Sequence, residues 1–212
     1  MSAQQPGCFI TVEGIEGVGK STNIQFIQDW LEQKKISYIV TREPGGTDLG
    51  ENLRELLLHG GAVNDDAELL MMFASRAQHL AEKITPALTS GVWVICDRFT
   101  DSTYAYQGGG RQLNVEHIAL LEKMVHSDTQ PNLTLLLDAP VEVGRARAAK
   151  RSEFDRIEAE DLAFFNRVRD MFILRSKQHE RYAVINANQS LERVQESIAK
   201  TLTVLFEKAK AL

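Results

Sequence analysis

The chain has 212 residues, of which 43% are hydrophobic and 25% charged, so it is long enough and apolar enough to bury the core of one globular domain. Its net charge of −5 and pI of about 5.6 argue against a broad nucleic-acid-binding surface, because such surfaces are basic. The 2 cysteines and 5 histidines show no disulfide framework and no metal-ligand spacing. No apolar run is long enough to span a membrane and no basic residue precedes Lys20, so we expect a cytoplasmic protein without a signal peptide.

The first motif along the chain, at residues 14–21 (GIEGVGKS), fits the pattern G-x-x-x-x-G-K-[ST] of a phosphate-binding P-loop. A short β-branched and aromatic run at residues 9–12 precedes it and predicts a buried strand. The residues after it have helical spacing, so a helix is expected to begin near Lys20. Strand, glycine-rich loop and helix is the context that this motif requires.

Such a loop binds phosphate through its backbone. Glycines allow consecutive N–H groups to face the phosphate oxygens, and the helix N-terminus adds the positive end of its dipole. Lys20 can then reach the β- and γ-phosphates, and the Ser21 hydroxyl can bind Mg²⁺. The predicted nucleotide-binding residues are Gly14, Ile15, Glu16, Gly17, Val18, Gly19, Lys20, Ser21 and Thr22.

Five short runs rich in aliphatic and β-branched residues predict strands, at residues 9–12, 38–40, 92–96, 133–138 and 182–185. Helical spacing predicts helices beginning near residue 20 and covering residues 49–59, 65–88, 114–126, 141–150, 160–177 and 191–205. This alternation is typical of a parallel sheet with helices on both faces. No repeat or linker interrupts it, so we predict a single α/β domain over residues 1–212.

Polar residues follow two of the predicted strands directly. In open α/β sheets, ligands bind outside the carboxyl ends of the strands. Arg42 lies at one such end, although it could also be a solvated loop charge, and Asp97 and Arg98 lie at another. A carboxylate at the end of a buried strand is costly unless it meets a positive charge, which bound Mg²⁺ would supply to Asp97.

Arg76 interrupts the apolar face of the helix predicted at residues 65–88, beside Met72 and Phe73. An arginine on such a face must be paired or must reach a pocket, and both interpretations remain open here. Residues 101–107, which we expect to form a loop or a short helix, are rich in hydrogen-bonding side chains. They suit either recognition of a small polar ligand or an ordinary polar loop.

Basic residues concentrate in the short helix predicted at residues 141–150 and in the segment that follows it. They are Arg145, Arg147, Lys150, Arg151 and Arg156. Most charge runs are solvated surface, but guanidinium groups also suit phosphate oxygens, and this cluster contrasts with the acidic balance of the whole chain.

The motifs, taken in order, resemble those of the thymidylate kinases over nearly the whole chain. They are the P-loop and residues 42–47 (REPGGT), 97–99 (DRF), 106–108 (YQG) and 155–158 (DRIE). The P-loop alone is unspecific, whereas its combination with REPGGT and DRF is highly specific. The resemblance implies the nucleoside-monophosphate kinase version of the P-loop fold, a homodimer, and Mg²⁺-dependent transfer of the γ-phosphoryl group of ATP to dTMP. The products would be ADP and dTDP, a precursor of dTTP.

On the donor side, the resemblance implies that Lys20 and Ser21 hold the ATP phosphates and Mg²⁺, and that Asp97 acts near the metal through water. Gly17 stands where some relatives carry an arginine, so the chain resembles the bacterial type, whose catalytic arginine comes from a lid. The lid is expected at about residues 145–157. Its candidates are Arg147, placed at ATP, and Arg151 and Arg156, either of which could be catalytic.

On the acceptor side, the resemblance implies that Arg42 and Arg98 hold the phosphate of dTMP and that Glu16 meets the 3′-hydroxyl of its sugar. Tyr106, next to Gln107 in the YQG motif, would lie under the deoxyribose and disfavour a 2′-hydroxyl.

The resemblance also places a thymine site beside Arg76, which would donate to the base, with Thr103 at the ring edge. Many relatives have a stacking phenylalanine four residues before this arginine. That position is Met72 here, with Phe73 next to it, and either side chain could cover the ring.

Other functions remain to be weighed against this one. A kinase acting on dUMP, UMP or a deoxynucleoside would share most of these motifs. A GTP-binding switch commonly reads guanine with Asn-Lys-x-Asp, which the chain lacks. A nucleotide-binding pseudo-enzyme is disfavoured because Lys20, Ser21, Asp97 and Arg98 are all present.

Overall fold

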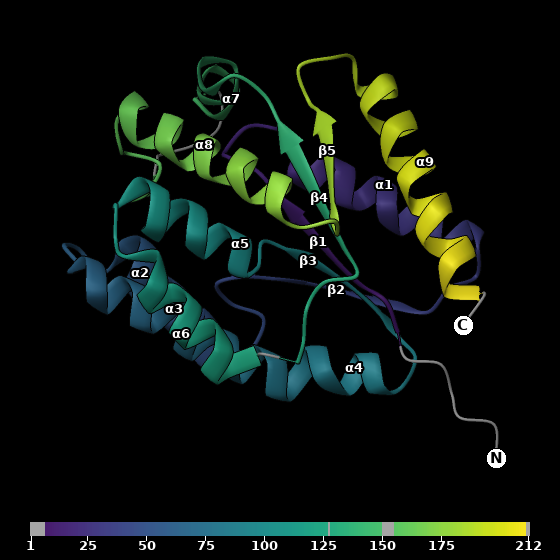
Figure 1. Cartoon of the computed structure of the whole chain (residues 1–212), viewed down its shortest axis with the longest axis horizontal. Helices are drawn as coiled ribbons and strands as arrows, with labels where there is room; N and C mark the ends of the chain where they lie inside the picture. The colour runs from purple at the N-terminus through teal and green to yellow at the C-terminus, as the bar shows by residue number, and fades with distance from the viewer. Residues whose placement is uncertain (1–6, 127, 150–154, 211–212) are drawn as a thin grey trace.

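The computed structural model of the protein describes residues 7–126, 128–149 and 155–210. Within them, five parallel strands form one sheet in the order β2-β3-β1-β4-β5 (Figure 1). The strands are β1 (Phe9–Glu13), β2 (Tyr38–Arg42), β3 (Trp93–Asp97), β4 (Leu133–Asp138) and β5 (Tyr182–Asn186). The predicted strands and the all-parallel sheet are confirmed.

Strand β1 occupies the centre of the sheet, with β3 on one side and β4 on the other. Val12 lies beside Asp97 of β3 and Leu135 of β4 in the parallel register. Because all strands run the same way, the P-loop that follows β1 and the polar residues that follow β2 and β3 meet at one edge of the sheet.

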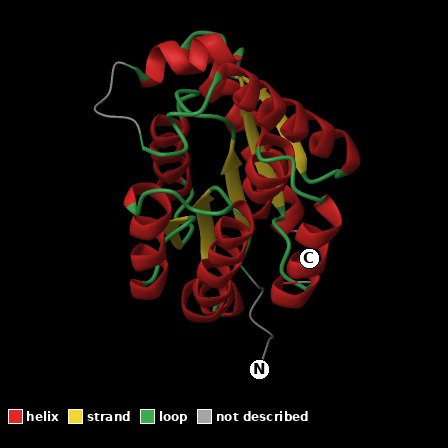
Figure 2. Ribbon diagram, turned by 90° about the vertical axis from the view of Figure 1, so that its left-hand side faces the viewer, coloured by secondary structure: helices red, strands yellow, loops and turns green. Residues whose placement is uncertain are grey.

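Helices cover both faces of this sheet (Figure 2). They are α1 (Lys20–Gln33), α2 (Asp48–His59), α3 (Asp65–His79), α4 (Thr85–Thr89), α5 (Thr100–Thr103), α6 (Val115–His126), α7 (Val141–Ala148), α8 (Leu162–Gln178) and α9 (Leu191–Lys210). On one face Ile10 and Val12 belong to a core with Ile27 of α1 and Ile198 of α9, and α1 and α9 contact each other. On the other face Phe9 packs in a separate core that includes Ile84.

One segment departs from the predicted helices and another resolves an open alternative. The single helix expected at residues 65–88 is divided by a π-helical turn, η1 (Leu80–Ile84), ahead of Pro86 in α4. For residues 101–107, where a loop or a short helix is expected, the structure has the helical alternative, as α5 and a second π-helix, η2 (Tyr104–Gly110). All seven residues of η2 are buried, because η2 packs against the length of α8. Local sequence pattern carries no information about that contact.

Among the described residues, none of the helices is both long enough and apolar enough to cross a bilayer.

Candidate active site

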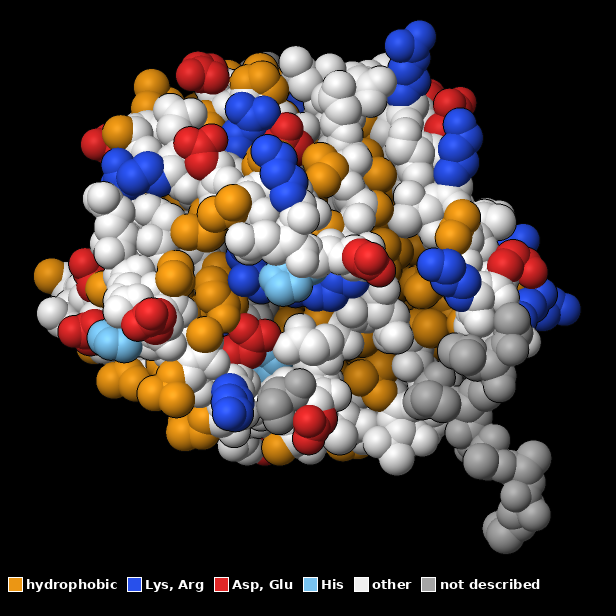
Figure 3. Space-filling model, in the orientation of Figure 1, with side chains coloured by type: hydrophobic (Ala, Val, Ile, Leu, Met, Phe, Trp, Pro, Cys, Tyr) orange, Lys and Arg blue, Asp and Glu red, His pale blue; other side chains and the backbone are white. Residues whose placement is uncertain are grey.

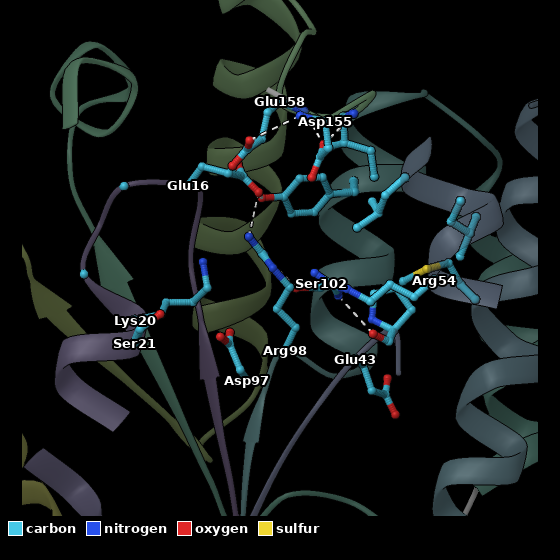
Figure 4. A pocket seen from close by; sticks show the side chains of 18 of the residues that line it. Glu16, Lys20, Ser21, Glu43, Arg54, Asp97, Arg98, Ser102, Asp155 and Glu158 are labelled. Carbon is cyan, nitrogen blue, oxygen red and sulfur yellow. Dashed lines mark hydrogen bonds and ion pairs between the residues drawn. The ribbon is translucent and has the colours of Figure 1, made fainter. Parts of the chain in front are cut away.

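A cavity of about 500 Å³ lies at the carboxyl edge of the sheet. Residues of the P-loop, of the turn after β2, of α2 and α3, of the β3 end with α5 and η2, and of the segment around α7 line it. Figure 4 places Lys20 and Ser21 on one side of this cavity and Arg54 on the other, with Asp97 and Arg98 between them. The site therefore joins segments that are far apart in the sequence.

The P-loop is held in place by close backbone packing. Gly17 has φ 74°, and a Cβ added to it would lie 1.9 Å from the carbonyl oxygen of Gly144, so only glycine fits there. Ile15 and Val18 are buried in the core, so any contact they make with phosphate is limited to their backbone. Gly19 begins α1 without a side-chain cap, which leaves the N–H groups of the first helical turn free for an anion.

The side chain of Lys20 folds back onto the P-loop. Its Nζ donates to the carbonyl oxygens of Gly14 at 3.1 Å and Ile15 at 3.2 Å. Burial lowers the pKa of Lys20 to about 8, and the positive charge of Arg98 adds to this shift. Lys20 is therefore largely protonated at neutral pH, and it would gain from the negative charge of a bound phosphate.

Arg98 projects into the cavity from a backbone with φ 69°, in the left-handed region. Its Nη2 donates to Glu16 Oε1 at 2.7 Å and its Nη1 to Ser102 Oγ at 3.1 Å (Figure 4). The hydroxyl of Tyr106 donates to the same Glu16 carboxylate at 2.7 Å, and the Arg98 guanidinium lies 4.8 Å from the centre of the Tyr106 ring. The structure thus brings three predicted site residues from three segments into contact.

Glu13, which sequence reasoning did not select, holds Ser102 next to this group. Its carboxylate is buried and accepts hydrogen bonds from the Phe99 backbone N–H at 2.7 Å and the Ser102 hydroxyl at 2.6 Å. Burial raises the pKa of Glu13 to about 8, and the negative charge of Asp101 acts in the same direction. The signal that was available is a carboxylate at the end of a buried strand, the same argument that selected Asp97.

Asp97 and Ser21 suit a hard cation. The Oδ1 atom of Asp97 is buried without a hydrogen-bond partner, and both residues line the cavity. The described residues contain no group of three or more His, Cys, Asp or Glu side chains able to hold a metal by themselves. A site of one carboxylate and one hydroxyl fits Mg²⁺, which keeps several waters and shares its coordination with substrate phosphates.

Arg76 is fully buried and does not line the cavity. Its Nε donates to Glu43 Oε2 at 2.8 Å and its Nη2 to Thr103 Oγ1 at 2.9 Å, so the internal ion pair considered above is confirmed. Within the part of the chain that the structure describes, its Nη1 has no hydrogen-bond partner. The Phe73 ring lies 4.8 Å from the Arg76 guanidinium and is also buried away from the cavity, whereas Met72 lines the cavity.

Two arginines near the turn after β2 differ in position. Arg42 lies outside the large cavity, with 54% of its side chain exposed, and pairs with Glu51 at 2.8 Å. Arg54 of α2 lines the cavity and its Nη1 donates to the carbonyl oxygen of Pro44 at 3.0 Å. Sequence reasoning overlooked Arg54. Its position one turn before the buried Leu57 on the predicted helix would have placed it on the inward side.

Only some residues of the expected lid region line the cavity. Arg147 lines the cavity, and its Nη1 donates to the Ala187 carbonyl oxygen at 3.2 Å. Arg156 does not line it: its Nε donates to the Leu57 carbonyl oxygen at 2.9 Å and its Nη2 pairs with Glu68. Arg151 lies outside the described residues.

Gln107 lines the cavity from η2 and is almost fully buried. Its Nε2 donates to Glu68 Oε1 at 2.7 Å, and its Oε1 has no partner. Glu68 itself was not selected from the sequence, because an acidic residue in the first turn of a helix is ordinary.

Comparison with known proteins decides the family. A model of the thymidylate kinase family matches residues 12–198, which is most of the chain. The chain belongs to the thymidylate kinase family. It is 56% identical over 203 residues to the thymidylate kinase of Chromohalobacter salexigens, covering 93% of this chain and 96% of that protein. It is 53% identical over 204 residues to the thymidylate kinase of Vesicomyosocius okutanii, covering 95% and 100% respectively.

A solved structure supports the same assignment. The crystal structure of thymidylate kinase from Ehrlichia chaffeensis matches with a TM-score of 0.76 and 34% identity, over 93% of this chain and 99% of that one. Both the fold class and the family predicted from the motifs are therefore confirmed, and the chain is a nucleoside-monophosphate kinase by family.

In this member of the thymidylate kinase family, most predicted site residues converge on one cavity. Those that line it are Glu16, Gly17, Gly19, Lys20, Ser21, Thr22, Met72, Asp97, Arg98, Tyr106, Gln107 and Arg147. Arg76, Phe73 and Thr103 form a buried group behind its wall, while Arg42 and Arg156 pair elsewhere. The roles assigned to individual residues remain predictions.

Proposed function

We propose that the chain transfers the γ-phosphoryl group of ATP to dTMP, forming ADP and dTDP. The observation that carries this proposal is the single cavity that joins a P-loop on one side to arginines and a hydrogen-bonding amide on the other. A phosphate donor and a nucleotide acceptor need these two sets of groups within one enclosed space.

On the donor side, the N-terminus of α1 and Lys20 would hold the ATP phosphates. Ser21 and Asp97 would hold Mg²⁺, Ser21 directly and Asp97 through water, in keeping with the unpartnered Oδ1 of Asp97. When bound, Mg²⁺ neutralises charge on the phosphate oxygens. Thr22 and Arg147, which also line the cavity, complete the donor side.

On the acceptor side, Arg98 and Arg54 would hold the phosphate of dTMP. Arg98 is oriented by Glu16 and Ser102, and Arg54 by the Pro44 carbonyl oxygen. Arg54 replaces Arg42 in this role, because Arg42 lies outside the cavity. The Glu16 carboxylate, which bonds to both Arg98 and Tyr106, would accept a hydrogen bond from the 3′-hydroxyl of the sugar. Met72, which lines the cavity, would cover the base.

The reaction needs no general base. The second pKa of a phosphomonoester is near ~6, so the attacking phosphate oxygen is already ionised at neutral pH. The obstacle is repulsion between two anions, which Lys20, Arg98 and Arg54 would offset at fixed positions. A lid arginine, Arg147 or Arg151, would add transition-state stabilisation of roughly 10³–10⁵ in rate by analogy with arginine fingers.

The test is formation of ADP from Mg-ATP, with dTMP, dUMP, UMP, dCMP, AMP and thymidine offered separately. We expect a strong rate with dTMP and none with thymidine, which lacks the acceptor phosphate. A preference for UMP or AMP would overturn the acceptor while keeping the fold. Hydrolysis of ATP that is indifferent to every acceptor would replace the kinase by a switch or an ATPase.

We further propose a homodimer, as the family resemblance implies. Helix α3 contacts both α2 and α6, and these three helices expose Leu56, Leu70, Leu120 and Met124. Figure 3 shows hydrophobic side chains gathered over this corner of the molecule. Sedimentation velocity should give a dimer for the wild type and a monomer for Leu120→Glu/Met124→Glu. The exposed Val204→Glu on α9 is the matched control and should remain dimeric. A cytoplasmic location stays a prediction from the sequence.

A further inference from the structure

Glu68 of α3 is a buried carboxylate that touches the active site only through other residues. Its side chain is 1% exposed, and it does not line the cavity. Its Oε1 accepts from Gln107 Nε2 at 2.7 Å and, at 3.5 Å, from Arg111 Nε. Its Oε2 accepts from Arg156 at 2.5 Å and from Arg111 Nη2 at 3.4 Å. The Gln107 amide thus bonds to Oε1, and the short bond from Arg156 goes to Oε2.

Glu68 is ionised at neutral pH. Burial acts to raise its pKa, but the hydrogen bonds from Gln107 and Arg156 and the charge of Arg111 outweigh it and hold the pKa below its usual value. An ionised carboxylate only accepts hydrogen bonds. Gln107 must therefore point its NH₂ group at Glu68, and the opposite orientation of the amide is excluded.

The consequence is that the carbonyl oxygen is the part of the Gln107 amide left without a bond to Glu68. Gln107 lines the cavity and is 1% exposed, and its buried Oε1 has no hydrogen-bond partner among the described residues. A buried carbonyl oxygen without a partner favours any ligand that brings a donor to it.

We propose that Glu68 is a positioning residue that sets the choice of pyrimidine, by fixing the Gln107 amide with its oxygen toward the acceptor base. This inference rests on the proposed function. Thymine and uracil carry a hydrogen on N3 and can donate it to Gln107 Oε1. Cytosine has a lone pair on N3, which would face the lone pairs of that oxygen. Glu68 thus selects 4-oxo pyrimidines over 4-amino pyrimidines without contacting either.

The substitution Glu68→Gln tests this directly. Arg111 and Arg156 would retain the new side-chain oxygen, because guanidinium groups only donate. The new NH₂ group would then face Gln107, which must turn its oxygen toward it and its own NH₂ into the cavity. That NH₂ can donate to N3 of cytosine. The change is close to isosteric, so it reverses a hydrogen-bond direction without opening a void.

The measurement is kcat/KM for dTMP and for dCMP, with ATP saturating. For the wild type we expect dTMP to be preferred by roughly 10² or more, since a site that leaves polar groups unpaired rejects the wrong ligand strongly. In Glu68→Gln we expect this ratio to fall by roughly tenfold or more, mainly through KM. Glu68→Asp keeps an acceptor-only group and should retain the preference, even where the overall rate falls.

The matched control is Glu160→Gln. Glu160 also pairs with Arg111 but does not contact Gln107, so its loss removes a charge from the same cluster and should leave the ratio unchanged. If Glu68→Gln lowers kcat/KM for both acceptors by the same factor, Glu68 is only structural and the proposal is wrong.

Two measurements on the wild type alone keep the proposal testable if a variant does not fold. Wild-type protein should reject N3-methyl-dTMP, which has no N3 hydrogen, and should prefer dTMP over dCMP. Equal use of dTMP and dCMP, or of dTMP and N3-methyl-dTMP, would overturn the role of Gln107 and of Glu68. A wild type that is inert with dTMP would instead refute the proposed function itself.

Discussion

The donor and acceptor sides of the cavity are built in different ways. On the donor side, the P-loop contributes mainly backbone, and its lysine bonds to carbonyl oxygens within 6 residues of it. On the acceptor side, the working groups are charged side chains held by other charged side chains. Glu43 holds Arg76 from 33 residues away, and Glu16 holds Arg98 from 82 residues away.

This difference shows which features of the chain determine the geometry of each side. A backbone site needs only glycines and a helix start, both of which are local properties. A site of paired side chains depends on the sheet order, which sets the carboxyl ends of β1, β2 and β3 side by side. We therefore expect changes on the donor side to abolish the chemistry, and changes on the acceptor side to alter binding, selectivity and stability.

The largest effect is expected on the donor side. Lys20→Ala should lower kcat by roughly 10³-fold or more, because a positive charge is lost where the transferred phosphoryl group develops negative charge. The free energy of unfolding should hardly change, since among the described residues the Nζ of Lys20 bonds to two carbonyl oxygens of its own loop and to no other group. Steady-state kinetics and urea unfolding check both points. The exposed Lys123→Ala is the control, and near-normal turnover of Lys20→Ala would refute the P-loop role.

The next effect concerns stability on the acceptor side. Glu43→Ala should lower the free energy of unfolding by about 3–5 kcal/mol, because it leaves the buried guanidinium of Arg76 without its partner. Glu51→Ala breaks the exposed pair with Arg42 and should cost about 0–1 kcal/mol. Urea unfolding of the two variants measures the contrast. Equal losses of unfolding free energy in the two variants would mean that burial of an ion pair has no effect on its contribution to stability.

A third test separates the two arginines near the turn after β2. Arg54→Ala should raise KM for dTMP by roughly 10–100-fold, the loss expected for a charged hydrogen bond to an anion. Arg42→Ala should change KM by less than about threefold, because Arg42 lies outside the cavity. Steady-state kinetics at saturating ATP decide the matter. The reverse order of effects would restore the role that the resemblance gives to Arg42.

The last test concerns a pH dependence of stability from Glu13, which bonds to the backbone of Phe99 and to Ser102 next to the cavity. Its folded pKa of about 8 is above its ordinary value, so the folded state keeps a proton that the unfolded state releases. Its contribution to stability is complete below the unfolded pKa and is lost as pH rises toward 8. The slope is up to about 1.4 kcal/mol per pH unit.

Urea unfolding between pH 5 and pH 9 measures this slope. Glu13→Gln should flatten it, because glutamine does not titrate; its carbonyl oxygen can accept from the Phe99 N–H and its NH₂ group can donate to the Ser102 hydroxyl oxygen. The exposed Glu207→Gln serves as the control and should keep the wild-type slope. An unchanged slope in Glu13→Gln would contradict the assignment to this carboxylate.

Much of the fold could be predicted from sequence pattern. Strand β1 is a continuous apolar run before a glycine loop, and β4 is a run of leucines that ends before Pro140. Where the pattern left alternatives open, a tertiary contact decided between them. Residues 104–110, with three glycines, are compatible with a loop or a short helix, and they form the buried π-helix η2 because α8 covers them.

The candidate site divides in the same way. Lys20, Ser21, Asp97 and Arg98 could be named because each follows a strand or a motif. Met72 and Phe73 could not be separated, since both lie on the inward side of one helix, and only the structure shows that Met72 lines the cavity. Arg54, Glu43 and Glu68 were not selected, because an isolated charge in a helix or a turn carries no local signal of its partner.

The sequence by itself determined the phosphate-binding loop, the parallel α/β class and the family, because these depend on short-range backbone geometry and on motifs at fixed spacing. The tertiary structure alone decided which charges meet. Arg76 pairs with Glu43, Arg156 pairs with Glu68, and Gln107 bonds to Glu68 through its NH₂ group, which leaves its buried oxygen without a partner among the described residues. The physical reason is that a buried charge or amide must satisfy its hydrogen bonds, and its partners are brought within reach only by the packing of distant segments.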